Sequence, residues 1–386
     1  MRDFLNETVR NMKPSGIRRF FDIAAEMDNV ISLGVGEPDF DTPWSIRETA
    51  IYTLEQGKTV YTANAGLKEL RMALSRYVKT KYSLDYDPLS EILITVGGSE
   101  AIDVGLRAML SEGIEVLVPE PSYVSYIPCV ELAGGTPVNV PLKLENEFKL
   151  KVEDLEPLVT ENTRILIMPF PNNPTGSIMT REELEPIADF CIRHDLFVIS
   201  DEIYAELSYG DKPHCSIATL PGMWERTLTI NGFSKAFSMT GWRLGYACGP
   251  QWLISQMTKI HQFAIMCAPT TSQYAAINAL EACDDKVAAM RREYNRRRRY
   301  VVHRLREMGV DCFEPFGAFY VFPSIAKFGM SSEEFCTRLL QEERVAVVPG
   351  DAFGKDGEGS VRISYAYSME SLKTALDRIE HFIQSL

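Results

Sequence analysis

Short apolar segments alternate with amphipathic segments from about residue 45 to residue 280 of this chain. The apolar segments are continuous and rich in Val, Ile and Leu, which is typical of strands buried on both faces of a mostly parallel sheet. They lie at residues 92–95, 114–119, 164–170, 196–200, 227–230 and 244–249. Helical patterns lie between them, and one of these begins with Thr180 and Glu183 at the spacing of a capping box. The repeated strand–helix–strand units predict a doubly wound α/β domain.

The pattern of the chain changes past residue 285. The elements expected there are a long helix at 286–310, strands at 318–324 and 360–367, and an amphipathic helix at 368–386. A length of 386 residues suggests two or three domains, each large enough for its own core. We therefore predict a large domain of residues 46–284 and a smaller α+β domain that combines residues 1–45 with residues 285–386.

The run of four arginines from Arg296 to Arg299 raises the question of nucleic-acid binding. The chain as a whole carries 40 Lys and Arg against 53 Asp and Glu, a formal charge of −13. Such an acidic balance argues against binding of nucleic acid or of an anionic membrane as the main task, because neutralising phosphates requires an excess of basic residues. Apolar side chains such as Met290 and Val301 predict that one face of this helix is buried, so we interpret the arginines as its solvated face.

The remaining composition indicates a cytoplasmic protein. No segment approaches the roughly 18–20 uninterrupted apolar residues that span a bilayer, and MRDFLNETVRNMKP at the start lacks the apolar region of a secretory signal. The eight cysteines are spread singly, with no C-x-x-C pair and no histidine at zinc-ligand spacing. We expect reduced cysteines and no metal site.

Polar side chains follow three of the predicted strands, at the point where each strand ends. Asn173 lies in the segment PNNPTG, Asp201 and Tyr204 lie in DEIY, and Lys235 lies in NGFSK. Ligands of open parallel sheets bind beyond the carboxyl ends of the strands, so these side chains are expected to lie together. Each alone is a weak signal, but together they place an amide, a carboxylate, a phenol and a nucleophilic amine at one edge of the sheet.

Residues 231–245, NGFSKAFSMTGWRLG, resemble the Schiff-base lysine segment of the class I aminotransferases, the pyridoxal-phosphate enzymes of the aspartate-aminotransferase fold. Other segments follow in the order of that family along nearly the whole chain: LGVGEPDFDTP, YTANAGLKELR, TVGGSEA, PEPSYVSY, PNNPTG, DEIY and SVRIS. The greatest likeness is to the subgroup of aromatic and related bacterial aminotransferases. The resemblance implies fold type I, with a large domain built on a mostly parallel sheet of the seven-stranded type flanked by helices, and a smaller α+β domain.

The resemblance also implies a role for each polar residue at the strand ends. Lys235 is expected to form the imine (aldimine) with the cofactor aldehyde and then to move a proton. Asp201 is expected to pair with the pyridine nitrogen, and Tyr204 and Asn173 to hydrogen-bond the ring 3′-oxygen. Lys235, Asp201 and Tyr204 are thus the catalytic candidates. Tyr123 is expected to stack on the pyridine ring. The simpler interpretations are a helix cap for Asp201 and core packing for Tyr123.

A phosphate site is implied by the segment GGSEA and by an arginine. Gly98, Ser99 and Glu100 lie between a predicted strand and a predicted helix, where backbone N–H groups and the helix dipole bind anions. Arg243 matches the phosphate arginine of the family, and a guanidinium group suits that task. Ser99, Gly98, Glu100 and Arg243 are therefore predicted to bind pyridoxal 5′-phosphate.

Two further phosphate contacts, Ser234 and Tyr61, are also considered. Some relatives carry a hydroxyl three residues before the lysine, but Gly232 stands there in this chain, which leaves Ser234 as the nearby hydroxyl. Tyr61 resembles a phosphate contact that is donated by a neighbouring subunit. That likeness implies a homodimer with shared active sites, and the alternative is that Tyr61 packs within its own subunit.

The substrate site is implied by Arg362, which interrupts an otherwise apolar strand pattern where an unpaired charge would be costly. The family uses this arginine to hold the substrate α-carboxylate, and a buried structural ion pair is the alternative. Gly36 and Asn173 are also expected beside the substrate. In PSGIRRFFDIA, Ile17 or Arg18 would reach the mouth of the pocket unless this segment is a surface helix.

The function implied is that of a pyridoxal-phosphate-dependent aminotransferase, which exchanges an amino group between an L-amino acid, aromatic or small, and a 2-oxo acid. A carbon–sulfur β-lyase on the same fold is the alternative, because it shares the lysine, the aspartate and the arginine. The residue patterns of YTANAGLKELR and MTGWRLGY resemble those of transaminases more than those of lyases, which favours the transaminase. A ligand-sensing regulator would need an added winged-helix domain, for which the chain has no room.

Overall fold

The computed structural model describes residues 4–12, 14, 27–211 and 213–386. At its centre lies a seven-stranded sheet. The strands are β2 (Ile92–Thr95), β3 (Glu115–Glu120), β4 (Thr136–Pro141), β5 (Thr163–Met168), β6 (Phe197–Asp201), β7 (Thr227–Gly232) and β8 (Gly245–Cys248). Their order is β2-β8-β7-β6-β5-β3-β4, and every neighbouring pair is parallel except the two that contain β8. The predicted α/β class with a mostly parallel sheet is confirmed.

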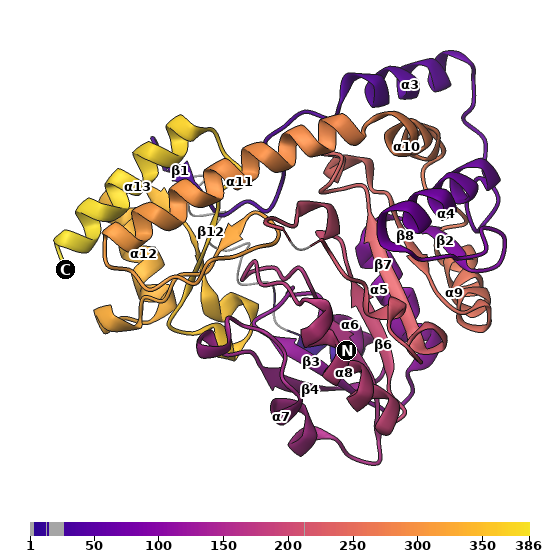
Figure 1. Ribbon diagram of the computed structural model, residues 1–386, viewed down its shortest axis with the longest axis horizontal. Helices are drawn as coiled ribbons and strands as arrows, with labels where there is room; N and C mark the ends of the chain where they lie inside the picture. Colours follow the sequence, from indigo (N-terminus) through magenta and orange to yellow (C-terminus); the bar gives the residue numbers. More distant parts are fainter. Residues whose placement is uncertain (1–3, 13, 15–26, 212) are drawn as a thin grey trace.

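Alternate residues of the central strands pack on opposite faces of the sheet, as the period of two requires. Ile165 and Ile167 of β5 pack with the core that α5, α6 and α9 cover, whereas Leu166 and Met168 pack with the core that α8 covers. The helices of this part are α3 (Trp44–Glu55), α4 (Lys68–Tyr82), α5 (Gly97–Met109), α6 (Tyr126–Leu132), α7 (Val152–Leu155), α8 (Arg181–Arg193), α9 (Gln251–Ala264) and α10 (Thr270–Ala282). Figure 1 shows them around the sheet.

Two local expectations differ in their outcome. The capping box of α8 is present, and the carboxylate of Glu183 accepts a hydrogen bond from the backbone N–H of Thr180 at 2.8 Å. Strand β4 was not predicted. It lies at the edge of the sheet, pairs only with β3 and contains Pro137 and Pro141, so it shows no continuous apolar segment.

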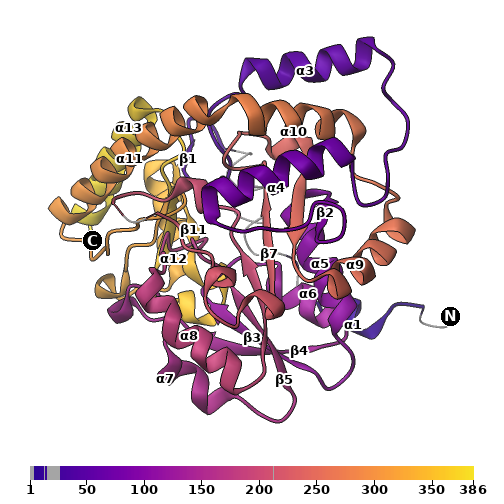
Figure 2. The same ribbon diagram turned by 45° about the vertical axis from the view of Figure 1, so that its right-hand side comes forward.

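The second part of the chain builds two small sheets beside the large one. The strands are β1 (Ile31–Ser32), β9 (Tyr320–Val321), β10 (Val345–Ala346), β11 (Val348–Pro349) and β12 (Val361–Ser364), and the helices are α11 (Asp284–Glu307), α12 (Ser332–Glu343) and α13 (Met369–Gln384). Strands β11, β12 and β9 form an antiparallel sheet, and β1 pairs with β10 in parallel. The expected long helix and terminal helix correspond to α11 and α13, which lie side by side in Figure 1 and Figure 2.

The pairing of β1 with β10 joins residues before Leu33 to the C-terminal part, as the predicted composition of the smaller domain requires. Helix α1 (Glu7–Asn11) instead lies beside α6 of the large sheet. The domain boundaries themselves stay a prediction. Among the described helices, each is either too short or too polar to traverse a lipid bilayer.

The interpretation of the arginine run as a solvated face is wrong for its two central members. Arg297 and Arg298 are buried, Arg297 between two carboxylates and Arg298 against one. Arg297 donates to both oxygens of Asp39 at 2.8 Å and to Glu293 at 2.9 Å, and Arg298 donates to Glu314 at 2.9 Å. Buried charges of this kind are tolerated because each has a partner of opposite sign. The apolar face predicted for this helix is buried, as Met290 and Val301 show.

Candidate active site

A cavity of about 560 Å³ lies between the carboxyl edge of the large sheet and the antiparallel sheet of β11, β12 and β9. Eleven of the residues predicted from the sequence line it: Gly36, Gly98, Ser99, Tyr123, Asn173, Asp201, Tyr204, Ser234, Lys235, Arg243 and Arg362. Most of them follow strands of the large sheet, and Arg362 comes from β12. The rule that ligands bind beyond the carboxyl ends of parallel strands thus located the cavity correctly.

Lys235 follows β7 and is surrounded by other residues of the cavity. Its Nζ donates to the carbonyl oxygen of Gly36 at 2.6 Å. Burial lowers the pKa of the Lys235 amine to about 8; Glu37 opposes this effect, while the positive charges of Arg362 and Arg243 add to it. A substantial fraction of the amine is therefore neutral near pH 8, and a neutral amine is the nucleophilic form.

Asp201 ends β6 and is nearly inaccessible to solvent. One carboxylate oxygen accepts a hydrogen bond from the hydroxyl of Tyr126 at 2.7 Å, and the other accepts one from the backbone N–H of Ile203 at 3.2 Å. Burial raises the pKa of Asp201, and the two hydrogen bonds act against that rise. A buried carboxylate held in this way suits a ligand group that carries a positive charge. Tyr126 was not singled out from the sequence, because the segment PSYVSY offers two tyrosines and no spacing rule that distinguishes them.

The start of α5 forms a cradle for an anion. Gly97 has a φ of +76°, and a Cβ atom there would lie 2.6 Å from Nη2 of Arg243. Glycine thus allows the guanidinium to lie against the first turn of the helix, where the backbone N–H groups of residues such as Ser99 have no partner within the helix. The hydroxyl of Ser99 lies 3.3 Å from that of Tyr123. Free N–H groups, a helix N-terminus and a guanidinium together fit a phosphate.

Glu100 does not line the cavity, although the sequence suggested it as a cofactor contact. One of its carboxylate oxygens lies 2.6 Å from Nδ1 of His261, and the other accepts a hydrogen bond from the backbone N–H of Val96 at 2.5 Å. Because His261 of α9 and the N-cap residue Val96 hold the carboxylate of Glu100, membership of GGSEA did not bring this side chain to the cavity.

Two other expectations concern Tyr61 and the segment that contains Ile17 and Arg18. Tyr61 is 80% exposed and does not line the cavity of its own chain. The Ile17 and Arg18 suggestion lies outside the described residues.

In the described part of the chain the hydrogen bonds of Arg362 go to an amide and to a backbone carbonyl rather than to a carboxylate, so the alternative of a buried structural ion pair has no support there. Its Nη1 donates to Oδ1 of Asn173 at 2.8 Å, and its Nη2 donates to the carbonyl oxygen of Gly34 at 2.5 Å. The guanidinium lies 4.5 Å from the ring centre of Tyr320 and 4.8 Å from that of Phe353. Its buried Nε has no hydrogen-bond partner. A buried guanidinium with a free donor fits a carboxylate ligand. Tyr320 and Phe353 were not predicted.

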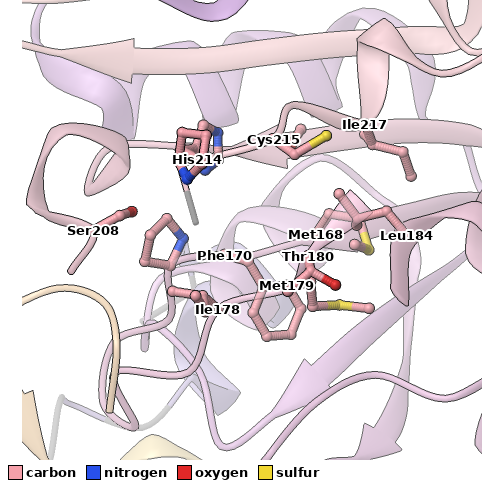
Figure 3. A pocket seen from close by; sticks show the side chains of 13 residues that line it. Met168, Phe170, Ile178, Met179, Thr180, Leu184, Ser208, His214, Cys215 and Ile217 are labelled. Atoms are coloured by element: carbon pink, nitrogen blue, oxygen red, sulfur yellow. The ribbon is translucent and has the colours of Figure 1, made fainter. Parts of the chain in front are cut away.

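A second, smaller hollow lies beside β5 and α8 (Figure 3), with room for about one water molecule. Apolar side chains such as Met168 and Ile217 line it, and His214 lies at its edge. Nε2 of His214 lies 2.8 Å from the buried carboxylate of Glu202. This hollow lacks a group of convergent charges, so the larger cavity remains the candidate active site.

Comparison with known proteins agrees with this geometry. Residues 28–379 match the family described as aminotransferase class I and II. The chain belongs to this family. It is 52% identical to a putative aminotransferase of Bacillus subtilis, over 99% of both chains, and 52% identical to an aspartate aminotransferase of Pyrococcus abyssi, over 98% of both. Among solved structures, an aromatic aminotransferase from Pyrococcus horikoshii has a TM-score of 0.91 at 49% identity, covering 96% of this chain and 99% of that one. Thermus thermophilus aspartate aminotransferase with maleate has a TM-score of 0.94 at 39% identity, covering 99% and 100%.

The protein is therefore an aminotransferase of fold type I that depends on pyridoxal phosphate. The aminotransferase relatives do not favour the β-lyase that the sequence left as an alternative. The residues of the cavity fit the cofactor. The half-buried amine of Lys235 and the buried carboxylate of Asp201 line the same cavity, and a Cβ atom at Gly97 would occupy the space beside Arg243.

Proposed function

We propose that this cavity is the active site, and that the enzyme exchanges an amino group between an L-amino acid, aromatic or small, and a 2-oxo acid. The observation that carries the proposal is the convergence of Lys235, Asp201 and Arg362 in one cavity. These groups supply a nucleophilic amine, a carboxylate for a positively charged ring nitrogen and a cation for a carboxylate.

Several side chains of the cavity would hold the cofactor. Asp201 would pair with the ring nitrogen, Tyr123 would cover one face of the ring, and Tyr204 with Asn173 would bond the ring 3′-oxygen. The phosphate would lie at Gly98 and Ser99, with Ser234 and Arg243 beside it. Bound pyridoxal phosphate supplies an electrophilic aldehyde and a ring that withdraws electrons.

Lys235 would hold and move the proton of the reaction. An amine with a pKa of about 8 gives up and regains a proton readily near neutral pH, as a general acid–base group requires. Its hydrogen bond to Gly36 shows that Nζ reaches the side of the cavity where Arg362 lies. Arg362 would hold the α-carboxylate of the substrate, with Asn173 and the backbone beside it.

We also place the enzyme in the cytoplasm as a homodimer with shared sites. Large apolar side chains are exposed on α3 and on the loop that follows it: Trp44, Ile51, Tyr52, Leu54, Val60 and Tyr61. Figure 2 shows α3 on the outside of the molecule, over α10. Apolar side chains gathered in this way mark an interaction surface, and a second copy would bring Tyr61 to the neighbouring phosphate cradle. The eight cysteines are unpaired, which suits a reducing compartment.

Reduction with borohydride, followed by peptide mapping, tests the assignment of the site. The cofactor-loaded enzyme should be yellow. Reduction should remove this colour and fix the cofactor to the peptide that contains Lys235. Recovery of the reduced cofactor on another lysine would contradict the assignment. A panel of aromatic, small and dicarboxylic amino donors, read by conversion of the cofactor to its amine form, then ranks the substrate classes.

A further inference from the structure

Two buried tyrosine hydroxyls meet at the wall of the cavity. The hydroxyl of Tyr320, on β9, lies 2.9 Å from the hydroxyl of Tyr204, which follows β6. Both side chains are buried, and both line the cavity. Tyr204 is the residue that would bond the ring oxygen of the cofactor, so Tyr320 reaches the cofactor site through Tyr204.

Tyr320 also contacts the arginine that would hold the substrate. The guanidinium carbon of Arg362 lies 4.5 Å from the ring centre of Tyr320 and 4.8 Å from the ring centre of Phe353. A Cβ atom on Gly36 would lie 2.6 Å from the Tyr320 hydroxyl and 3.8 Å from Nη1 of Arg362, so the glycine leaves the room that both groups occupy. Tyr320 thus contacts Arg362 through its ring and Tyr204 through its hydroxyl.

The number of protons fixes the direction of the hydrogen bond between the two tyrosines. A tyrosine hydroxyl has one proton to donate. If Tyr204 donates its proton to the ring oxygen, Tyr320 must donate in the bond that the two hydroxyls share. Donation to the oxygen of Tyr204 strengthens the bond that Tyr204 itself donates, because hydrogen bonds in a chain polarise one another.

The charge of Arg362 acts on this chain of hydrogen bonds. A nearby cation stabilises negative charge on the oxygen of Tyr320 and so makes its hydroxyl a stronger donor. A carboxylate bound to Arg362 offsets that charge, which weakens donation by Tyr320 and then by Tyr204. Other titratable groups near Tyr320 in the described part of the chain include Tyr123, Glu37, Tyr365 and Tyr367, and Lys235 lies 5.8 Å from the ring centre of Tyr204. The hydrogen bonds of Arg362 go instead to Asn173 and Gly34.

We propose that Tyr320 is a positioning residue that transmits carboxylate binding at Arg362 to the hydrogen bond made by Tyr204. The inference rests on the proposed function, since it requires the cofactor in this cavity. Tyr204 favours negative charge on the ring oxygen, so weaker donation raises the pH at which the bound cofactor loses its proton and its yellow colour.

The test is a spectrophotometric pH titration of the cofactor-loaded enzyme, with and without 3-phenylpropanoate, a carboxylate that has no amino group. Wild type should show a midpoint that rises when the carboxylate binds. Tyr320→Phe keeps the ring over Arg362 but removes the hydroxyl. Its midpoint without carboxylate should rise by about half a pH unit, the equivalent of one ordinary hydrogen bond. The further rise on carboxylate binding should be at least halved.

Two further variants separate this role from general disturbance of the fold. Tyr86→Phe is the matched control, because its buried hydroxyl lies 3.3 Å from that of Thr229 outside the cavity, and it should leave both midpoints unchanged. In a Tyr204→Phe background, Tyr320→Phe should cause no additional shift. If Tyr320→Phe does not fold, 3-fluorotyrosine at this position keeps the hydroxyl, makes it a stronger donor and should lower the midpoint.

The outcomes distinguish this inference from the function on which it rests. Wild-type midpoints in Tyr320→Phe, with cofactor and carboxylate both bound, would overturn the inference and leave the proposed function intact. The inference would also be overturned if Tyr320→Phe shifted the midpoint equally in the wild-type and in the Tyr204→Phe background. Failure of the wild-type protein to bind pyridoxal phosphate at Lys235 would overturn both.

Discussion

At the scale of single residues, burial of Lys235 determines the fraction of its amine that is neutral at a given pH. With a pKa of about 8 rather than the usual 10.5, the amine of the cofactor-free enzyme is half neutral near pH 8. The rate at which the cofactor-free enzyme takes up pyridoxal phosphate covalently should therefore rise with pH, with a midpoint near 8. Stopped-flow absorbance measures this rate. In Lys235→Ala the cofactor should bind without this covalent phase, and transamination should fall about 10³-fold or more. A rate that is flat between pH 7 and 9 would contradict the assignment.

The sign of the effect on stability follows from the same pKa. Because the pKa of Lys235 is lower in the folded than in the unfolded chain, the unfolded chain binds more protons between about pH 8 and the usual value for lysine. This group therefore contributes stability to the cofactor-free enzyme that increases as the pH rises through that window. Urea unfolding at pH 8 and pH 10 should show that part of the increase disappears in Lys235→Met.

A second prediction at this scale concerns Asp201 and its hydrogen-bond partner Tyr126. Asp201→Asn should retain the cofactor but slow proton removal from the substrate by at least about 10²-fold, because an amide does not hold the ring nitrogen in its protonated form. Tyr126→Phe removes the 2.7 Å hydrogen bond but keeps the carboxylate, so its effect should be smaller and in the same direction. Single-turnover absorbance with a saturating amino donor measures both. Near-normal rates in Asp201→Asn at full occupancy would contradict the role of Asp201.

Spacing in the sequence identified the residues at strand ends and missed their partners. Asn173, Asp201 and Lys235 could be predicted because they follow apolar strands directly. Tyr126 and Tyr320 could not, since each acts across the cavity on a residue far away in the sequence. Contacts of that kind depend on how the elements pack, which a single sequence does not show.

At the scale of elements, the start of α5 determines how well the phosphate is held. Gly97→Ala would place a Cβ atom 2.6 Å from Nη2 of Arg243 and would strain a backbone with a φ of +76°. The dissociation constant for pyridoxal phosphate should rise at least about tenfold, equivalent to about 1.4 kcal/mol. Gly113→Ala is the control, because its φ of +86° gives similar strain while a Cβ atom would meet nothing within 4 Å. If both variants weaken the cofactor equally, the cradle is not specific to Gly97.

The elements that could be predicted are those with a strong period or an uninterrupted apolar segment. The central strands and α8, α11 and α13 have such patterns. The edge strand β4 does not, because one side of it has no neighbour and its prolines interrupt the apolar pattern. Arg297 was assigned to solvent because its partner Asp39 comes from a distant loop, and only the fold brings the two together.

At the scale of the whole molecule, the proposal of a shared active site predicts complementation between two differently impaired subunits. When Tyr61→Phe is mixed with Lys235→Ala under subunit exchange, one site of the hybrid has Lys235 from one subunit and Tyr61 from the other. Its activity should exceed that of either parent. The control mixes Arg243→Ala with Lys235→Ala. Both residues line the cavity of the same chain, so no hybrid site is complete. No gain in the first mixture, despite verified exchange and a measurable defect of Tyr61→Phe, would reject the shared site.

Transfer of a labelled amino group tests the central claim most directly. The enzyme, loaded with pyridoxal phosphate, is incubated with a ¹⁵N-labelled aromatic amino acid and an unlabelled 2-oxo acid, and the products are followed by mass spectrometry. The label should appear in the amino acid that is formed from the 2-oxo acid, and Lys235→Ala should abolish the transfer. With cystathionine as the donor, little pyruvate or free ammonia should form. Release of pyruvate and ammonia from cystathionine, without labelled product from any amino donor, would contradict the account.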